Sequence, residues 1–557
     1  MQYALSVQHL AGRSRPEKKF CPMRFLFLTG NMGVGKSTVG RLLAQRLGCP
    51  FYDLDALIEA SVGKRIAQIF AEQGEAGFRE QERHQLQQLV RLQPGVVATG
   101  GGVVLDPRNR ALMRQYGWVI YLHAHPETLL ARIGETATRP LLHGADDPLE
   151  AMKRIAQQRE PLYREADWVL ETSDQTPDAL VDSLQRLMAP SPESPLRIQA
   201  LACPIMLAPG IRACLVSYLG AIQPSRVVIL THPVLQREGA ALLDALLREG
   251  IPATLLILPA GERLKTLRRA ARLYHALLEA GADRASMLLV LGGGVLGDLG
   301  GFVAATYMRG IPFALIPTTL LAQIDASIGG KVAVDLPEGK NLVGAFHQPR
   351  MVLIDPELLQ SLPTRHWRNG LAEMFKYGVA LDRGLWRRLQ SHLERQVIQA
   401  RRIRKSPAEW LLPIARCVAL KAQIVAEDER DERGLRALLN FGHTVGHAVE
   451  AALGYRQWLH GEAVAAGMCA EAELGSLLGI TPREVVTELR ETLRTAGLPT
   501  RLPALPVESL LRSMQHDKKR VGTRLRVVLL SAIGQAQLVD EVPLEAMREA
   551  LARCGAQ

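Results

Sequence analysis

The chain has 557 residues, of which 47% are apolar and 22% charged, so it is globular, with several domains, rather than disordered. Its net charge of +11 comes from dispersed basic residues with few aromatics among them, which favours anionic small substrates and argues against nucleic acid. No apolar run reaches the roughly 20 residues of a membrane span. The seven cysteines are scattered and never in C-x-x-C spacing, which argues against a disulfide framework and against a cysteine-ligated zinc site.

The N-terminal stretch 1–23 lacks the long apolar core of a signal peptide, and we expect a disordered extension there. Together with the cysteine pattern, this predicts a cytoplasmic protein.

A nucleoside triphosphate site is predicted directly after the first apolar strand, R-F-L-F-L-T. The strand runs into G-N-M-G-V-G-K-S-T, which satisfies G-x-x-x-x-G-K-[ST], and a helix is expected over 39–47. Backbone N–H groups of such a loop curl round a phosphate, and the following helix adds its positive end. Lys36 would neutralise the β- and γ-phosphates and Ser37 would hold magnesium.

The following motifs predict the rest of that site. Asp53 and Asp55 follow a second strand, where alternation places both on one side; one could serve the metal shell and the other an acceptor hydroxyl. A helix cap is the alternative role for such a pair. Arginines then recur in short Gly- or Pro-punctuated motifs: Arg79 in F-R-E-Q-E, Arg139 in T-R-P-L-L and Arg159 in R-E-P-L-Y, with T-G-G-G at Gly100–Gly102 between them. Guanidinium groups grip carboxylates and phosphates well.

Residues 24–188 resemble shikimate kinase over essentially their whole length. The resemblance implies nucleotide and magnesium binding by Gly33, Val34, Gly35, Lys36, Ser37, Thr38, Asp53, Arg132 and Arg139. It implies shikimate binding by Asp55, Arg79, Gly101 and Arg159, and catalytic roles for Lys36, Asp55 and Arg139, the last on a lid. Gluconate kinase and similar small kinases share the P-loop, and a regulatory, inactive kinase-like module is a further alternative.

A linker and a second α/β block are predicted next. The stretch 189–200 has three prolines and two serines, so we expect it to be extended rather than packed. In 201–355, apolar strands begin at Arg226 and Ala253, and M-L-L-V-L-G-G-G-V-L-G-D reads as strand, turn and helix. Its G-x-G-x-x-G lacks the acidic residue about 20 positions on that a standard Rossmann unit has, so it favours a dinucleotide in a different arrangement.

The last block, 356–557, is helical by its apolar spacing and contains a predicted metal site. His443 and His447 lie four apart and would share a helix face, and His460 follows a short break. With Glu373 upstream, these imidazoles suit a metal such as zinc. Spacing alone favours His443 and His447 as the ligand pair.

From Ala253 onward, and by extension from Leu201, the chain resembles 3-dehydroquinate synthase. The motifs are L-P-x-G-E-x-x-K, G-G-G-V-x-G-D, D-x-S-x-G-G-K, G-K-N, L-A-E-x-x-K-Y, L-N-F-G-H-T-x-G-H and L-H-G-E. The resemblance implies an NAD-binding α/β domain, an all-helical metal-binding domain, and a site between them. It makes Glu373, His443 and His460 the ligands of zinc or cobalt, with His447 facing the substrate.

The same resemblance implies conversion of 3-deoxy-arabino-heptulosonate 7-phosphate to 3-dehydroquinate and phosphate, with NAD regenerated in each turnover. Implied NAD contacts are Glu262, Lys265, Gly293, Gly294, Val295, Asp298, Thr318 and Thr319. Implied substrate contacts are Arg309, Asp325, Lys331, Lys340, Asn341, Lys376, Lys421, Arg436, Asn440 and Lys518. Lys331, Glu432 and His447 are the implied catalytic residues, and Arg309, reaching a neighbouring subunit's site, implies a homodimer.

The whole chain is thus predicted to be an α/β fusion of a P-loop kinase with a dehydroquinate synthase, acting on small molecules without nucleic acid or membrane partners. The alternative for the second half is a polyol dehydrogenase or another sugar-phosphate cyclase. A dehydrogenase would consume NAD stoichiometrically and would have little use for Lys331, Lys340 and Lys518.

Overall fold

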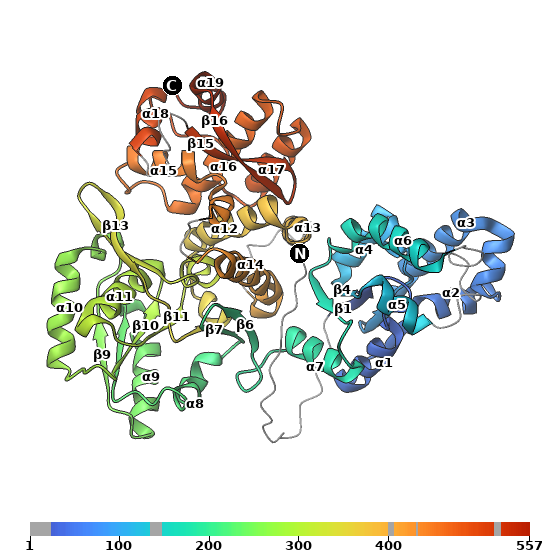
Figure 1. Cartoon of the computed structure of the whole chain (residues 1–557), viewed down its shortest axis with the longest axis horizontal. Coiled ribbons are helices and arrows are strands. Elements are labelled where there is room, and N and C mark those ends of the chain that lie inside the picture. Colours follow the sequence, from blue (N-terminus) through green and yellow to red (C-terminus); the bar gives the residue numbers. More distant parts are fainter. Residues whose placement is uncertain (1–23, 134–146, 399–405, 430–432, 517–524) are drawn as a thin grey trace. The chain divides into compact units, whose positions relative to one another are not determined.

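The computed structural model describes residues 24–133, 147–398, 406–429, 433–516 and 525–557. The predicted extension 1–23, the lid residue Arg139, Glu432 and Lys518 lie outside these ranges. The chain divides into two compact units, Met1–Ala189 and Pro190–Gln557, each of which is described by itself (Figure 1). Within the described ranges, no helix is both long and apolar enough to cross a membrane.

The first unit is built on a five-stranded parallel sheet in the order β2-β3-β1-β4-β5. Its strands are β1 (Phe25–Thr29), β2 (Phe51–Asp53), β3 (Val96–Ala98), β4 (Gly117–His123) and β5 (Trp168–Glu171). All five residues of β1 are buried, because a parallel sheet covered on both faces needs a continuous apolar run rather than alternation.

Helices connect these strands. They are α1 (Lys36–Leu47), α2 (Leu54–Val62), α3 (Ile66–Leu89), α4 (Pro107–Tyr116), α5 (Pro126–Ile133), α6 (Pro148–Tyr163) and α7 (Pro177–Met188). The core of this unit joins Phe25 and Phe27 of the sheet to Leu54, Phe78 and other apolar residues of the helices. Beyond the carboxyl ends of β1, β2 and β3 the chain continues into α1, α2 and the 3-10 turn Val103–Leu105, and this end of the strands is where ligands bind in open α/β sheets.

The second unit begins with a seven-stranded sheet in the order β6-β7-β14-β11-β10-β8-β9, parallel except for the β6–β7 pair. The strands are β6 (Leu196–Ala200), β7 (Cys203–Leu207), β8 (Val227–Thr231), β9 (Ala253–Ile257), β10 (Met287–Gly292), β11 (Phe313–Pro317) and β14 (Met351–Ile354). The prediction of an unpacked linker over 189–200 is wrong for its last five residues. They alternate buried and exposed and pair with β7, so burial of Leu196, Ile198 and Ala200 fixes them as a sheet edge.

Helices and a hairpin complete this α/β part. The helices are α8 (Leu215–Leu219), α9 (Gln236–Arg248), α10 (Leu267–Glu279) and α11 (Gly294–Thr306), and the hairpin is β12 (Lys331–Leu336) with β13 (Gly339–Phe346). Short 3-10 or π turns cover Glu262–Leu264, Tyr307–Arg309 and Ala322–Ala326. The core lies between the sheet and α8 and α9, with Leu289, Ile229 and Leu246 fully buried.

The remainder is helical, as predicted, with one addition. Its helices are α12 (Thr364–Leu381), α13 (Arg383–Ile398), α14 (Pro407–Glu427), α15 (His443–Ala452), α16 (His460–Leu477), α17 (Arg483–Thr495), α18 (Val507–His516) and α19 (Leu544–Arg553). The addition is an antiparallel hairpin, β15 (Leu525–Ala532) and β16 (Gln535–Val542), whose apolar residues Val527 and Leu529 join the core around α15 and α16. In Figure 1 the colour of this part runs from gold at α12 to dark red at α19.

Candidate active sites

The first unit contains a pocket of about 810 Å³ that joins the P-loop to the arginine motifs. It brings together the predicted residues Gly33, Gly35, Lys36, Ser37, Thr38, Asp53, Asp55, Arg79, Gly101 and Arg159. Lys36 Nζ donates to the backbone oxygens of Gly30, at 2.8 Å, and Asn31, at 2.9 Å. Its ammonium therefore lies against the loop whose backbone N–H groups form the anion-binding concavity of a P-loop.

Of the two aspartates predicted at the end of the second strand, Asp53 lies there and Asp55 does not. Strand β2 ends at Asp53, which caps α2 by accepting from Ala56 N at 3.4 Å and also accepts from Ser37 Oγ at 2.6 Å. Asp55 is not at the strand end but in the first turn of α2, because the helix starts at Leu54. Both still line the pocket. The helix-cap and magnesium-shell roles of Asp53 are thus compatible.

Arg79 is held at the pocket wall by two carboxylates. Its Nη1 lies 2.9 Å from Glu82 Oε2 and its Nη2 lies 2.9 Å from Glu75 Oε1. Gly102 leaves the room for this guanidinium, since a Cβ there would come within 2.0 Å of Arg79 Nη2. Glu82 was not among the residues predicted from sequence, although F-R-E-Q-E places it one helical turn from Arg79.

Glu82 is fully buried, and its Oε1 has no hydrogen-bond partner within the described ranges. Burial raises the pKa of its carboxyl to about 7, against the opposing effect of Arg79 and with a further contribution from Asp55. Glu82 therefore keeps its proton to a higher pH than an exposed glutamate does.

Two other predicted residues of this unit lie elsewhere. Val34 is buried. Arg132 does not line the pocket but donates to the backbone oxygens of Thr172, at 2.6 Å, and Ser173, at 3.1 Å.

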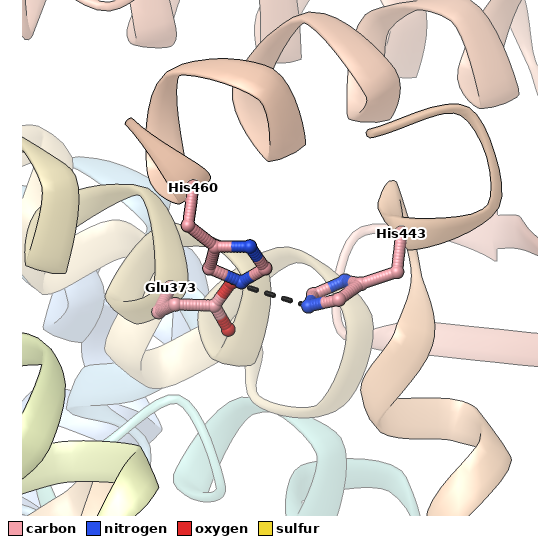
Figure 2. Close-up of side chains that lie close together, drawn as sticks. All are labelled: Glu373, His443 and His460. Carbon is pink, nitrogen blue, oxygen red and sulfur yellow. Dashed lines mark ion pairs between the residues drawn. The ribbon is translucent and has the colours of Figure 1, made fainter. Parts of the chain in front are cut away.

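A compact group of possible metal ligands lies in the second unit, where three helices meet. Figure 2 shows Glu373 of α12 facing His443, the first residue of α15, and His460, the first residue of α16. Glu373 Oε1 lies 3.4 Å from His443 Nε2 and 3.5 Å from His460 Nε2. The ring of His447 lies 5.3 Å from that of His443 and 5.9 Å from that of His460.

The protonation states of Glu373 and His443 favour metal binding. Burial would raise the pKa of the Glu373 carboxyl, but Lys376, His443 and His460 hold it well below its usual range. Burial also lowers the pKa of His443 well below its usual value, so this imidazole is neutral and has a free lone pair. His460 differs, because Glu373 and Glu450 outweigh its burial and raise its pKa to about 10.

The donor set fits a divalent cation. Both Glu373 oxygens are buried and accept no hydrogen bond from the described residues, although Oε2 forms an ion pair with Lys376. A buried carboxylate facing two imidazole nitrogens has the carboxylate-plus-histidine chemistry of catalytic zinc sites, which keep a coordination position open. These three residues, rather than the His443–His447 pair that spacing favours, offer ligand atoms to one point.

Hydrogen bonds between residues far apart in the sequence fix the first residues of α15 and α16, the helices that carry His443 and His460. Glu471 of α16 is fully buried and accepts from Gly442 N at 2.6 Å and Val445 N at 3.2 Å. It thereby caps α15, whose N-cap residue Gly442 has no side chain and adopts φ +81°. Asn369 of α12 accepts from Gly461 N at 2.6 Å, which fixes the start of α16 beside His460.

Polar side chains predicted to bind substrate lie beside the metal group. Asp325, in the π turn after β11, accepts from Lys421 Nζ at 2.7 Å and from Tyr377 OH at 2.6 Å. Lys376 pairs with Glu373 and lies over the Tyr377 ring, 4.9 Å from its centroid. These contacts join α12 and α14 to the α/β part. Both ammonium groups are buried, and each is paired with a carboxylate.

The Gly-rich turn between β10 and α11 forms a second polar group. Lys265 is buried and donates to Asp298 of α11 and to Asn341 Oδ1 of β13. Gly293 is the N-cap residue of α11 and offers no side chain to cap the helix. Gly293 and Thr319, which follows Thr318 after β11, are close, since a Cβ on Gly293 would lie 3.2 Å from Thr319 Cγ2. Gly294 and Val295 are the first two residues of α11, and Glu262 lies in the 3-10 turn before Lys265.

The remaining predicted substrate residues are more dispersed. Lys331 is exposed at the start of β12, with its ammonium 6.0 Å from the Phe346 ring centroid, and Arg309 is exposed in a 3-10 turn. Arg436 lies in a second 3-10 turn, Leu435–Asn440, and donates to Glu429 O at 2.8 Å. Asn440 is the last residue of that turn, three positions before His443.

Comparisons with known proteins agree with this arrangement. Residues 32–189 match the shikimate kinase family, residues 255–369 the 3-dehydroquinate synthase N-terminal domain, and residues 370–520 the C-terminal domain of the same enzyme. A 3-dehydroquinate synthase of Synechococcus sp. is 46% identical over 332 residues, which cover 59% of this chain and 88% of the relative. One from Bordetella pertussis is 45% identical over 350 residues, or 63% of this chain and 96% of the relative.

A solved structure is similar as well. The 2-epi-5-epi-valiolone synthase from Streptomyces hygroscopicus, with NAD+ and Zn2+ bound, is 28% identical with a TM-score of 0.58, covering 64% of this chain and 98% of that one.

Fold and sites together define a two-part enzyme, a P-loop kinase joined to an α/β-plus-helical enzyme with a histidine–carboxylate centre. The chain belongs to the 3-dehydroquinate synthase family and carries a shikimate kinase domain ahead of the synthase. It is a bifunctional enzyme of the shikimate pathway, with kinase and lyase activities.

Proposed function

We propose that the first unit, over residues 24–188, transfers the γ-phosphoryl group of ATP to the 3-hydroxyl of shikimate. The single pocket that joins the P-loop to Asp55, Arg79 and Arg159 supports this. Lys36 would stabilise charge on the transferring phosphoryl group. Asp55 would accept the proton of the attacking hydroxyl, and the two guanidinium groups would hold the shikimate carboxylate. Ser37 and Asp53, already joined at 2.6 Å, would share the magnesium shell.

We propose that the second unit converts 3-deoxy-arabino-heptulosonate 7-phosphate to 3-dehydroquinate and inorganic phosphate. The observation that carries this is the Glu373–His443–His460 group beside Asp325, Lys376 and Lys421. When bound, NAD supplies reversible hydride acceptance, and a divalent metal, zinc or cobalt, supplies Lewis acidity toward substrate oxygens.

The chain's own residues would bind, orient and move protons. Glu373, His443 and His460 would hold the metal, and Lys265, Asp298 and the turn from Gly293 would hold NAD. Lys376, Lys421, Lys331, Lys340 and Arg436, with Asp325, Asn341 and Asn440, would bind the substrate's phosphate, carboxylate and hydroxyl groups. His447 beside the metal ligands would move a proton at the substrate. The family pattern adds Arg139 to the kinase, and Glu432 and Lys518 to the synthase.

The metal assignment has a direct test in metal content. Purified wild-type protein should hold one equivalent of zinc or cobalt, and E373Q and H443A should hold far less while losing phosphate release from the heptulosonate phosphate. E473Q is the matched control. Glu473, on α16, is like Glu373 a buried and ion-paired glutamate, and its Oε2 lies 2.9 Å from Arg483 Nη1. Full metal content in E373Q would contradict the assignment.

We also propose a cytoplasmic homodimer formed through the synthase half, in which Arg309 serves the neighbouring subunit's site. The six described cysteines are free, which supports the compartment. Arg309 is exposed, and it follows Met308 with φ values of +69° and +50°, a strained pair that is typical of functional positions.

A mixing experiment tests the shared site. R309A and E373Q are each expected to be inactive as synthases. After exchange of subunits, one site of each mixed dimer has both wild-type residues, so about a quarter of wild-type activity should return. No recovery in verified mixed dimers would place Arg309 outside the partner's site.

A further inference from the structure

A second carboxylate lies behind the metal ligand His460. Glu450 of α15 is buried, and its Oε2 accepts from His460 Nδ1 at 3.0 Å. The other nitrogen of the same ring, Nε2, lies 3.5 Å from Glu373 Oε1. The imidazole therefore forms a hydrogen bond through Nδ1, and its Nε2 faces the other two candidate metal ligands.

Lys340 neutralises this second carboxylate from the α/β part of the unit. Its Nζ lies 3.4 Å from Glu450 Oε1 and 3.6 Å from Glu262 Oε1. The ammonium also lies over the ring of Tyr455, 4.4 Å from its centroid. Glu450 thus has one oxygen for His460 and the other for a cation, which is how a buried carboxylate becomes tolerable.

The positions of the possible ligand atoms allow two roles for Glu450: ligand of a second metal ion, or support for the metal ligand His460. His447, Glu450 and His460 lie close enough to hold a cation of their own. However, the Lys340 ammonium already provides a positive charge at Glu450. In addition, a second metal ion would have to bind the lone pair of His460 Nδ1, whereas this nitrogen carries the N–H that donates to Glu450. The contacts therefore favour a support for one metal over a second metal site.

We infer that Glu450 is a positioning residue that fixes the tautomer and ring orientation of His460, so that Nε2 is presented to a single metal ion, with Lys340 balancing the charge. The inference rests on the proposed metal site. A carboxylate that accepts the distal N–H of a ligating histidine orients the ring and raises its basicity.

The test measures metal affinity without turnover. Cobalt is titrated into metal-free full-length wild-type, E450Q and E450A proteins in competition with a chromophoric chelator, and the visible Co(II) absorption is recorded at saturation. Loss of such a support typically weakens binding about 10- to 100-fold. E450Q keeps an oxygen acceptor without the charge, so its loss should be smaller than that of E450A, and both should shift the Co(II) spectrum.

E473Q serves as the control, since it should keep wild-type affinity and spectrum. One equivalent of cobalt in the wild type, with the graded loss in the two Glu450 variants, supports the inference. Two equivalents in the wild type, wild-type affinity in both variants, or an equal loss in E473Q would overturn it. If the wild type binds no cobalt, or if E373Q binds cobalt as well as the wild type, the proposed metal site itself is wrong. If the wild type binds cobalt and E450A binds it equally well, the metal site stands and only the proposed role of Glu450 is wrong.

Discussion

The carboxylate of Glu471 accepts a hydrogen bond of 2.6 Å from the backbone N–H of Gly442, and so one histidine-bearing helix of the synthase caps the other. Gly442 offers no side chain for capping, and the first amide groups of α15 would otherwise be unpaired in the interior. The position of His443 at the first residue of that helix therefore depends on a residue 29 positions beyond Gly442 in the chain.

Replacing Glu471 with alanine should destabilise the synthase half and weaken its metal binding. Two buried N–H groups lose their acceptor, at about 1–3 kcal/mol each. Calorimetry of the metal-free chain should show the synthase transition at a lower temperature, and cobalt titration should show weaker binding. E549A, which removes an exposed glutamate of α19, is the control. An unchanged transition in E471A would exclude the capping role.

The two activities should be separable by single substitutions, because each unit contains a set of its own predicted ligands. K36M removes the charge inside the P-loop and should lower the rate of shikimate phosphorylation by a factor on the order of 100 or more. Phosphate release by the synthase should be unchanged. K153M, which removes an exposed lysine of α6, should affect neither rate. Loss of synthase activity in K36M would show that the units depend on each other.

Stability of the kinase half should depend on pH through Glu82. Its pKa is about 7 in the folded chain against an ordinary value of 4.5, chiefly because of burial, so the folded state holds this proton more tightly than the unfolded state. The contribution of Glu82 to the free energy of unfolding is therefore greatest below pH 4.5, falls as pH rises to about 7, and then stays constant. The free energy of unfolding changes by up to ~3 kcal/mol over this range.

Comparison of wild type with E82Q isolates this effect. The amide does not titrate, so the unfolding temperature of wild type minus that of E82Q should fall between about pH 5 and pH 7.5. The kinase transition is identified by its shift on adding ATP and shikimate. A difference that stays constant over this range would contradict the raised pKa.

Local motifs in the sequence predict much of the fold and of the two sites. The P-loop, the apolar parallel strands and the helical character of the last block all follow from short-range patterns. The strand β6 is missed because prolines at 190, 192 and 195 suggest a linker, whereas the alternation that follows them is short. The hairpin β15–β16 is missed because its apolar residues lie between helical patterns on both sides.

The proposed metal ligands show more clearly what sequence patterns cannot predict. Helical spacing pairs His443 with His447, but the ligand atoms that meet are on three different helices, and only tertiary packing brings Glu373 and His460 to His443. The supporting glutamates Glu450 and Glu471 were likewise missed. One signal was present, since both are charged residues in apolar, Ala-rich helical runs, and a charge buried there needs a partner.

The proposed synthase reaction requires that NAD and a metal act as catalysts while phosphate leaves the heptulosonate phosphate. The deciding measurement is phosphate release by the full-length protein with NAD far below the substrate concentration, before and after chelation with EDTA. We expect many phosphates released per NAD, loss of release on chelation, and recovery with zinc or cobalt. Release that stops when the NAD is consumed, or that continues undiminished in a verified metal-free protein, would contradict this mechanism.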